Sequence, residues 1–195
     1  MQLTQVLSLV ALIVLSAFFA GSETALFSLS RIRVRHLMDK GVPKASLIFK
    51  LINEPSRLLS TLLIGNNVVN IVSSSLATVL FISLLGPTYG VPTAMIITTV
   101  LVLIFGEIVP KTYANHFPEK WAFRAITPIK ALMSVLAPVI TVLTGVTNMV
   151  MRLTGKTHIR SSLVTEDELR TVINLGQKDG IIEAEERSMV LLIMW

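Results

Sequence analysis

The sequence contains no cysteine and has few charged or aromatic residues. Without cysteine there is no disulfide, no thiolate metal site and no thiol nucleophile. Only 15% of the residues are charged and 6% are aromatic, whereas 52% are hydrophobic. The mean hydropathy of +0.72 is atypical of a soluble globular domain. We therefore expect an all-α integral membrane protein.

Charge is completely missing from three long stretches, which are residues 1–22, 58–106 and 131–151. About 20 apolar residues in a helix cross the hydrocarbon core of a bilayer. The first two stretches predict three transmembrane helices, at about 4–28, 58–85 and 92–117. The second and third spans are joined by a short uncharged connection at 86–90, which contains two glycines and a proline and is typical of a turn.

Basic residues flank the apolar stretches, which is the pattern of a topology signal and not of a nucleic-acid surface. Segment 31–57 carries seven lysines and arginines against two acids, with apolar residues between them. It predicts amphipathic helices at 31–55 on the cytoplasmic interface, broken near Gly41 and Pro43. This basic cluster follows the first apolar run, so we expect a span in place of a signal peptide. The chain would lie in the cell membrane with its N-terminus outside and its C-terminus in the cytoplasm.

The third uncharged stretch, 131–151, has two interpretations. It is just long enough to cross the bilayer, yet basic residues stand on both sides of it, at Lys120, Arg124 and Lys130 and again at Arg152 and Lys156. Two cytoplasmic flanks require an even number of crossings. We therefore favour interfacial helices over 119–153, as a hairpin or a belt bent near Pro128 and Pro138, over a fourth span with the tail outside.

The C-terminal segment, 156–195, is acidic, since seven of the twelve acids of the chain fall within 165–195. Thr165 and Glu168 have the spacing of a capping box at a helix start. We expect a transmembrane domain over 1–155 followed by a short acidic helical segment in the cytoplasm.

Two spans carry polar residues at membrane depth. The first contains Gly21, Ser22, Glu23 and Thr24 near its predicted inner end. In the second span, one helical face carries Asn66, Asn70, Ser73 and Ser74. Such residues commonly serve helix packing and interhelical hydrogen bonds, which could also hold a dimer together. The other interpretation is a stripe of hard oxygen ligands.

The third span contains FGEIVPK, residues 105–111, in which Glu107 ends a run of 49 uncharged positions. A carboxylate at membrane depth is costly and commonly functional. Pro110 has no N–H for the carbonyl of Gly106, four residues earlier, so that carbonyl beside Glu107 could bind a cation. The alternative is that Glu107 pairs with Lys111, one helical turn away.

Counted from the inner ends of the spans, Ser22, Asn70 and Glu107 fall at similar depths, so three helices can meet at one polar centre. Its oxygen ligands would suit magnesium, calcium, manganese or sodium and not zinc or copper. There is no Ser-His-Asp grouping, no pair of carboxylates and no phosphate-binding loop. We do not expect an enzyme.

Three segments together, FFAGSETALFSLS (18–30), LLIGNNVVNIVSSSLAT (62–78) and FGEIVPKTYANHFPEK (105–120), resemble the transmembrane domain of the CorC/CNNM family of magnesium transporters. The resemblance implies a homodimer in the lipid bilayer with three spans per protomer. It also implies magnesium export driven by sodium entry. The ligands that it implies are Ser22, Asn70, Ser74, Glu107 and the Gly106 carbonyl, with Asn66 as a further candidate.

The same resemblance implies that 165–195 precedes a pair of CBS modules, which are absent from this chain. Any ATP binding would occur only through those modules. Residue 20 is alanine, where the resemblance implies relatives with serine, so one hydroxyl ligand would be missing here or was never a ligand. A different class of function also fits the residues: a membrane scaffold or magnesium sensor that modulates another transporter, with the polar stripe holding a dimer.

Overall fold

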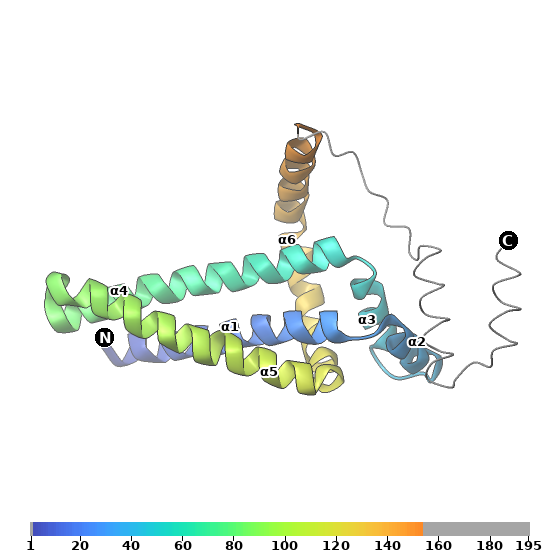
Figure 1. Ribbon diagram of the computed structural model, residues 1–195, viewed down its shortest axis with the longest axis horizontal. Helices are drawn as coiled ribbons and strands as arrows, with labels where there is room; N and C mark the ends of the chain where they lie inside the picture. Colours follow the sequence, from blue (N-terminus) through green and yellow to red (C-terminus); the bar gives the residue numbers. More distant parts are fainter. Residues whose placement is uncertain (1, 154–195) are drawn as a thin grey trace, which may run out of the picture. The chain divides into compact units, whose positions relative to one another are not determined.

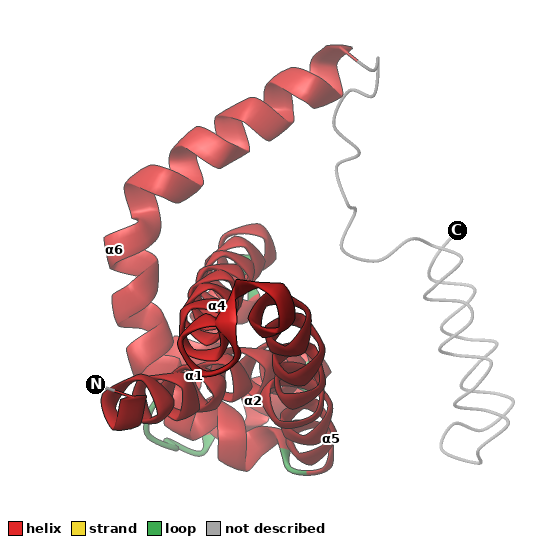
Figure 2. Cartoon of the chain, turned by 90° about the vertical axis from the view of Figure 1, so that its left-hand side faces the viewer, coloured by secondary structure: helices red, strands yellow, loops and turns green. Residues whose placement is uncertain are grey.

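The structure is a computed structural model that describes residues 2–153, and the predicted acidic helices of 156–195 lie outside the described residues. Every element in the described part is a helix (Figures 1 and 2). In chain order they are α1 (Gln2–Ser28), α2 (Arg31–Asp39), α3 (Ala45–Ile52), α4 (Pro55–Leu101), the π-helix η1 (Val102–Ile108), α5 (Val109–His116) and α6 (Pro118–Leu153). Residues up to Gly145 form one compact unit, and the packing described below concerns that unit.

The long helix α4 is two antiparallel rods joined at Gly86. Gly86 has φ 75° and ψ 170°, a conformation that is open to glycine because it has no Cβ. Pro87 follows directly and restarts the helix, in agreement with the predicted turn. The first rod therefore covers residues 55–85. The second begins at 87 and continues through η1 and α5 to His116, as the green and yellow rod of Figure 1 shows.

The described part contains three helical stretches that are long and apolar enough to cross a membrane. They are Gln2–Ser28, Pro55–His116 and Pro118–Thr147. Because the second one reverses at Gly86, it supplies two rods, so α1 and these two rods match the three predicted spans. The prediction of an all-α membrane protein is confirmed.

Close contact between α1 and its neighbours depends on small residues. α1 packs against both rods, against α4 on one side and η1 and α5 on the other. Gly65 of α4 faces the ring of Phe19, whose nearest carbon would lie 2.6 Å from an added Cβ. Gly21 faces the indole of Trp121 from α6 just as closely. Without side chains at these two positions, aromatic rings fill the space between rods, which suits helix packing in lipid.

At one end of the rods, the two short helices and the first half of α6 enclose a common core. α6 buries residues that recur at helical spacing, which are Ala122, Ala125, Ile126, Ile129 and Met133. They contact Val34 of α2 and Ile48 of α3 in the same hydrophobic cluster. On the surface, Arg33 Nε of α2 lies 2.7 Å from Glu119 Oε1 of α6. The first part of α6 is thus an amphipathic helix fastened to α1, α2 and α3.

α6 passes through both of its prolines as one helix and does not form the hairpin that was one of the alternatives for 131–151. Pro128 and Pro138 are exposed, so the carbonyl groups that lose their helical partners lie on the open side of the helix, away from the buried core. Figure 1 shows the part of this helix up to Gly145 running across the rods and not alongside them. A belt at the interface agrees with this arrangement, although whether 131–151 crosses a membrane stays a prediction.

The contact at Gly21 gives a test of how closely α1 and α6 must approach. We expect Gly21→Ala to lower the free energy of unfolding by about 1–3 kcal/mol, because the new methyl group overlaps the Trp121 ring. Gly145→Ala is the matched control, since a Cβ there meets nothing within 4 Å and alanine favours a helix by about 1 kcal/mol. Thermal unfolding of both variants in detergent measures the difference. Equal midpoints would contradict the packing of Trp121 on Gly21.

Candidate cation site

The polar centre of the three rods is built around Ser16 of α1, a residue that the sequence analysis did not single out. Ser16 is completely buried. Its Oγ lies 2.8 Å from Asn70 Oδ1 and 3.2 Å from Asn66 Oδ1. The hydroxyl has one proton to donate to these two amide oxygens, which stand one helical turn apart on α4, and Asn70 Oδ1 is the nearer acceptor. One serine therefore joins α1 to the asparagine stripe of the second span.

Glu107 brings the third rod to the same centre. Asn70 uses both ends of its amide, because Oδ1 accepts from Ser16 while Nδ2 donates to Glu107 Oε1 at 3.3 Å. The bonds thus connect three segments that lie far apart in the sequence. Asn70 and Glu107 lie together, as the sequence predicted. The serine of α1 that joins them is Ser16 and not Ser22, which was the expected residue.

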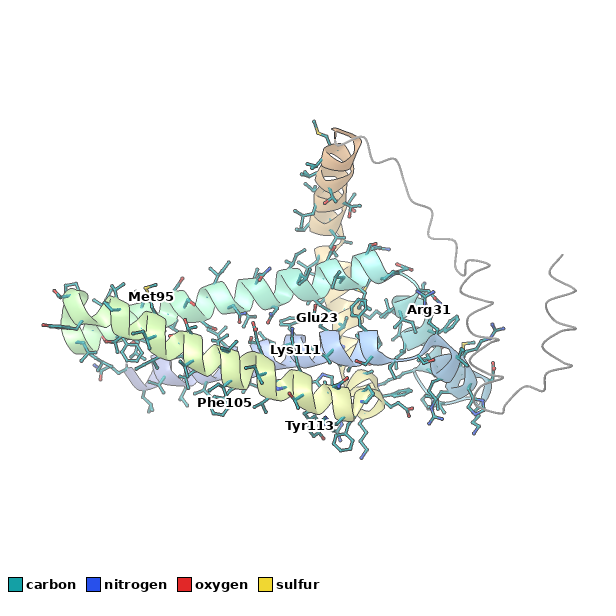
Figure 3. All side chains as sticks on the ribbon, in the orientation of Figure 1. Glu23, Arg31, Met95, Phe105, Lys111 and Tyr113 are labelled. Atoms are coloured by element: carbon teal, nitrogen blue, oxygen red, sulfur yellow. The ribbon has the colours of Figure 1, made fainter. Side chains whose placement is uncertain are left out.

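The alternative in which Glu107 pairs with Lys111 does not occur. Lys111 Nζ instead lies 3.3 Å from Glu23 Oε2 of α1, and the two residues face each other near the labelled positions in Figure 3. Within residues 2–153, Glu107 makes no ion pair. Lys111, the charged residue one turn after Glu107, is therefore already paired with Glu23. The Glu107 carboxylate is left without a balancing positive charge in the described part.

The turn around Glu107 is a π-helix, which changes the argument about the Gly106 carbonyl. The N–H of Val109 bonds to the carbonyl of Ile104, five residues back, where an α-helix would bond four residues back. In that wider register the N–H that Pro110 lacks would have faced the carbonyl of Phe105, five residues back, in place of that of Gly106. The proline argument therefore no longer singles out Gly106, and a ligand role for its carbonyl stays a prediction.

Gly106 has a different role, which is to let two helices approach closely. A Cβ at this position would lie 3.0 Å from Ser16 Oγ and 3.3 Å from Ser16 Cβ, which is tighter than ordinary contact. Glycine therefore lets η1 approach α1 at the level of the polar centre. The neighbouring residue, Glu107, is brought close to Asn70 by the same approach.

Two other predicted ligands have different neighbours. Ser22 donates to the carbonyl of Phe18 and accepts from Trp121 Nε1 at 3.1 Å. It stands six residues from Ser16, or about 9 Å along the helix, and it anchors α6. Ser74 is exposed and follows Asn70 by one turn. It lines a cavity that also includes Glu107.

That cavity lies between the second and third spans and has a volume of about 210 Å³. Its lining residues are Ser74, Thr98, Thr99, Val102, Leu103 and Glu107. One carboxylate oxygen of Glu107 therefore accepts a hydrogen bond from the Asn70 amide, and the side chain also borders this open cavity. From the order of residues along the rods, the cavity lies toward the Gly86 turn, whereas the pair of Glu23 and Lys111 lies toward α2.

The chemistry available at this centre is that of oxygen ligands. A hydroxyl, two amide oxygens and a carboxylate converge, and no group of three His, Cys, Asp or Glu side chains occurs in the described part. Hydroxyl, amide and carboxylate oxygens are ligands for hard cations such as magnesium, calcium and sodium. With one formal negative charge, the centre would hold such a cation weakly enough to release it.

Comparison with known families matches the chain to a transmembrane domain. The model of the cyclin M transmembrane N-terminal domain, CNNM, matches residues 7–186. The chain belongs to the CNNM family. The match includes most of α1, both rods of α4, and the segment with η1 and α5, so each residue of the polar centre lies within the CNNM domain.

Several curated proteins are similar to this CNNM domain. It is 37% identical over 182 residues to the inner membrane protein YfjD of Escherichia coli, which covers 92% of this chain and 42% of the relative. It is 36% identical over 167 residues to a UPF0053 protein of Haemophilus influenzae, covering 85% of this chain and 40% of the relative. A protein of Salmonella typhimurium named polyamine export protein is 26% identical, over 96% of this chain and 45% of its own length. The chain thus spans less than half the length of these relatives.

The central position of Ser16 can be tested by its removal. Ser16→Ala leaves the amide oxygen of the half-buried Asn70 without its donor, which we expect to lower the free energy of unfolding by about 1–3 kcal/mol. Ser75→Ala is the control, because the Ser75 hydroxyl is exposed and bonds only within its own helix to Ile71. Chemical or thermal unfolding in detergent reports both variants. A Ser16 variant as stable as the Ser75 variant would show that this hydroxyl does not join the rods.

Proposed function

We propose that this CNNM domain carries magnesium ions through the membrane, and that the polar centre of Ser16, Asn66, Asn70 and Glu107 is where the ion binds in transit. One observation carries the proposal. Glu107 is half-buried among apolar rods, contacts an amide and has no cationic partner in the described part. An uncompensated carboxylate at membrane depth is costly, and a bound cation would remove that cost.

The donor set favours a hard divalent ion. Magnesium takes oxygen ligands and gives up its hydration water reluctantly. Three neutral side-chain oxygens and one carboxylate would replace part of that water at the centre. The Gly106 carbonyl and Ser74 are further ligands that we retain in the proposal. Ser22 is not retained, because its hydroxyl is occupied by Phe18 and Trp121.

The positions of the cavity and the ion pair suggest how access would be controlled. On the Gly86 side of Glu107 there is open volume. On the α2 side, the pair of Glu23 and Lys111 joins α1 to α5, and Ser22 is bonded to Trp121. A centre that is open on one side and closed on the other is what alternating access requires. We infer export of magnesium in exchange for sodium, by a homodimer in the cell membrane.

A second candidate cargo comes from the relatives that carry the name polyamine export protein. A polyamine presents several ammonium groups spaced along a flexible chain, so its binding calls for several acids at matching intervals. Among residues 2–153, the polar centre offers Glu107 alone, because Glu23 is already paired with Lys111. The geometry therefore favours a compact inorganic ion. A third possibility, a scaffold or magnesium sensor without flux, is an outcome of the test below.

The test is magnesium flux in proteoliposomes containing the purified chain, with and without an opposing sodium gradient. We expect Glu107→Gln to lower the initial rate by more than about tenfold, because attraction between full charges in a low-dielectric setting far exceeds the 1.4 kcal/mol that tenfold represents. Glu119→Gln is the control, since its contact with Arg33 is at the surface and should matter little. Spermidine efflux from the same vesicles tests the polyamine alternative.

Three results would count against the proposal. A Glu107→Gln variant that transports magnesium at the parent rate would remove its main support. Spermidine flux without magnesium flux would favour the second cargo. If the parent protein is folded but carries neither cation, the scaffold or sensor interpretation would replace transport.

A further inference from the structure

A second cavity, away from the polar centre, lies at the end of the rods that carries α2 and α3. It has a volume of about 190 Å³ and is formed by α3, the beginning of α4 and the first half of α6. Three basic residues line it, Lys50, Arg57 and Lys130, together with one acid, Glu54. The proposed transport of ions does not use this cavity, so its charge calls for a separate explanation.

Two of the three cations at this basic cavity have no acid to balance them. Arg57 Nη1 lies 3.1 Å from Glu54 Oε2, so these two residues form a neutral pair. Lys50 and Lys130 make no ion pair within residues 2–153. Three cations against one acid give the lining a net charge of +2, which makes the cavity complementary to an anionic group.

Apolar residues of the packed core also line the basic cavity. Leu51 of α3 is 5% exposed and Met133 of α6 is 6% exposed. Both belong to the hydrophobic cluster that joins α3, α4 and α6. The cavity is therefore held open by three packed helices and not by a loop. A group bound there meets cations and hydrocarbon together, which suits the headgroup of an amphiphile.

The position of the basic cavity along the chain sets its level in the membrane. Arg57 is the last charged residue before the uncharged stretch 58–106, and Lys130 is the last one before 131–151. The fold brings these two boundaries to one cavity. Charge gives way to apolar sequence where the headgroups of a bilayer meet its hydrocarbon core. The cavity therefore lies at the level of lipid phosphates.

We propose that the basic cavity binds the headgroup of an anionic phospholipid, whose phosphate is held by Lys50 and Lys130. Val68 and Ile71 follow Arg57 on α4 by 11 and 14 residues, which is about three and four turns, so they continue the same helical face into the membrane. Both are more than half exposed, and an acyl chain can lie along them. A free phosphate ion gains nothing from that apolar face, which is why we assign the cavity to a lipid. The bound lipid contacts α3, α4 and α6 at once and holds α6 against the rods.

The test follows thermal unfolding of the full chain in micelles of a neutral detergent while phosphatidylglycerol is added. A ligand that binds the folded protein raises its unfolding temperature according to its affinity. We expect the double variant Lys50→Gln with Lys130→Gln to bind phosphatidylglycerol at least tenfold more weakly, because two charge-assisted contacts to phosphate are lost. Without lipid it should unfold at the parent temperature, since both lysines are exposed and outside any ion pair of the described part.

Two further double variants are the matched controls. Lys40→Gln with Arg124→Gln removes the same amount of charge from exposed positions that do not line the cavity, so the affinity should change less than threefold. Lys50→Arg with Lys130→Arg keeps the charge at the cavity, and a guanidinium binds phosphate well, so phosphatidylglycerol should still stabilise this variant. The first control separates the cavity from general attraction to a basic surface, and the second shows that the charge is what matters.

Phosphatidylcholine and inorganic phosphate complete the experiment as a zwitterionic lipid and a soluble anion. Stabilisation of the parent by phosphatidylglycerol alone, lost in the Lys50→Gln and Lys130→Gln variant, supports the lipid site. Equal stabilisation by inorganic phosphate would mean that the cavity takes a free anion, and it would overturn the assignment to a lipid. The inference is also overturned if phosphatidylcholine acts as well, if the two glutamine variants lose affinity equally, or if phosphatidylglycerol has no effect on the parent. None of these results depends on which ion the protein carries.

Discussion

The hydrogen bond from Asn70 to Glu107 is the interaction around which the three rods are arranged. A carboxylate among apolar helices needs donors, and the described structure supplies one amide and no cation. Once the Asn70 amide nitrogen is directed at Glu107, its oxygen points to Ser16, which in turn lies near Asn66. The orientation of one amide thus sets the register of α1 against α4 and of η1 against both. In lipid, such polar contacts replace the hydrophobic driving force that is missing between helices.

The polar contacts require short distances between rods, and glycine provides them at three levels. Gly65 and Gly21 accommodate aromatic rings, and Gly106 accommodates Ser16. The second of these contacts matters beyond packing, because Trp121 also donates to Ser22. α6 is therefore attached to α1 about two turns from Ser16, by both shape and a hydrogen bond. A movement of α6 would act directly on the helix that carries the centre of the site.

Much of this arrangement could be predicted from the sequence, because lipid restricts the choices. The uncharged stretches predicted the spans, and Gly86 with Pro87 predicted the reversal. The spacing of Asn66 and Asn70 and the isolated charge of Glu107 predicted two rods at one polar centre. Ser16 could not be found in this way, since a lone serine in an apolar helix has no local signal and its partners lie 50 and 54 residues away.

Three further features depend on tertiary contacts and were not predicted. The sequence suggested a partner for Glu107 on its own helix, because Lys111 follows by one turn, but the ion pair forms across helices with Glu23. The π-helix also has no reliable sequence pattern. Pro110 lacks the N–H that a regular helix would use at this point. The wider turn of η1 occurs where Gly106 lies close to Ser16. The continuity of α6 through two prolines follows in the same way from the buried face that holds it.

The pairing of Lys111 with Glu23 decides the charge of the site and so the kind of cycle it can support. The two acids and one lysine leave one negative charge, on Glu107. If the proposed cargo is correct, a magnesium ion brings the centre to a net charge of +1, whereas a sodium ion brings it to zero. The divalent ion gains more from the carboxylate but leaves an unbalanced charge in a low-dielectric setting. The monovalent ion is held less strongly and leaves none. Under the proposed function, a single carboxylate would bind magnesium and still give it up when sodium takes its place, which two carboxylates at the same point would make much harder.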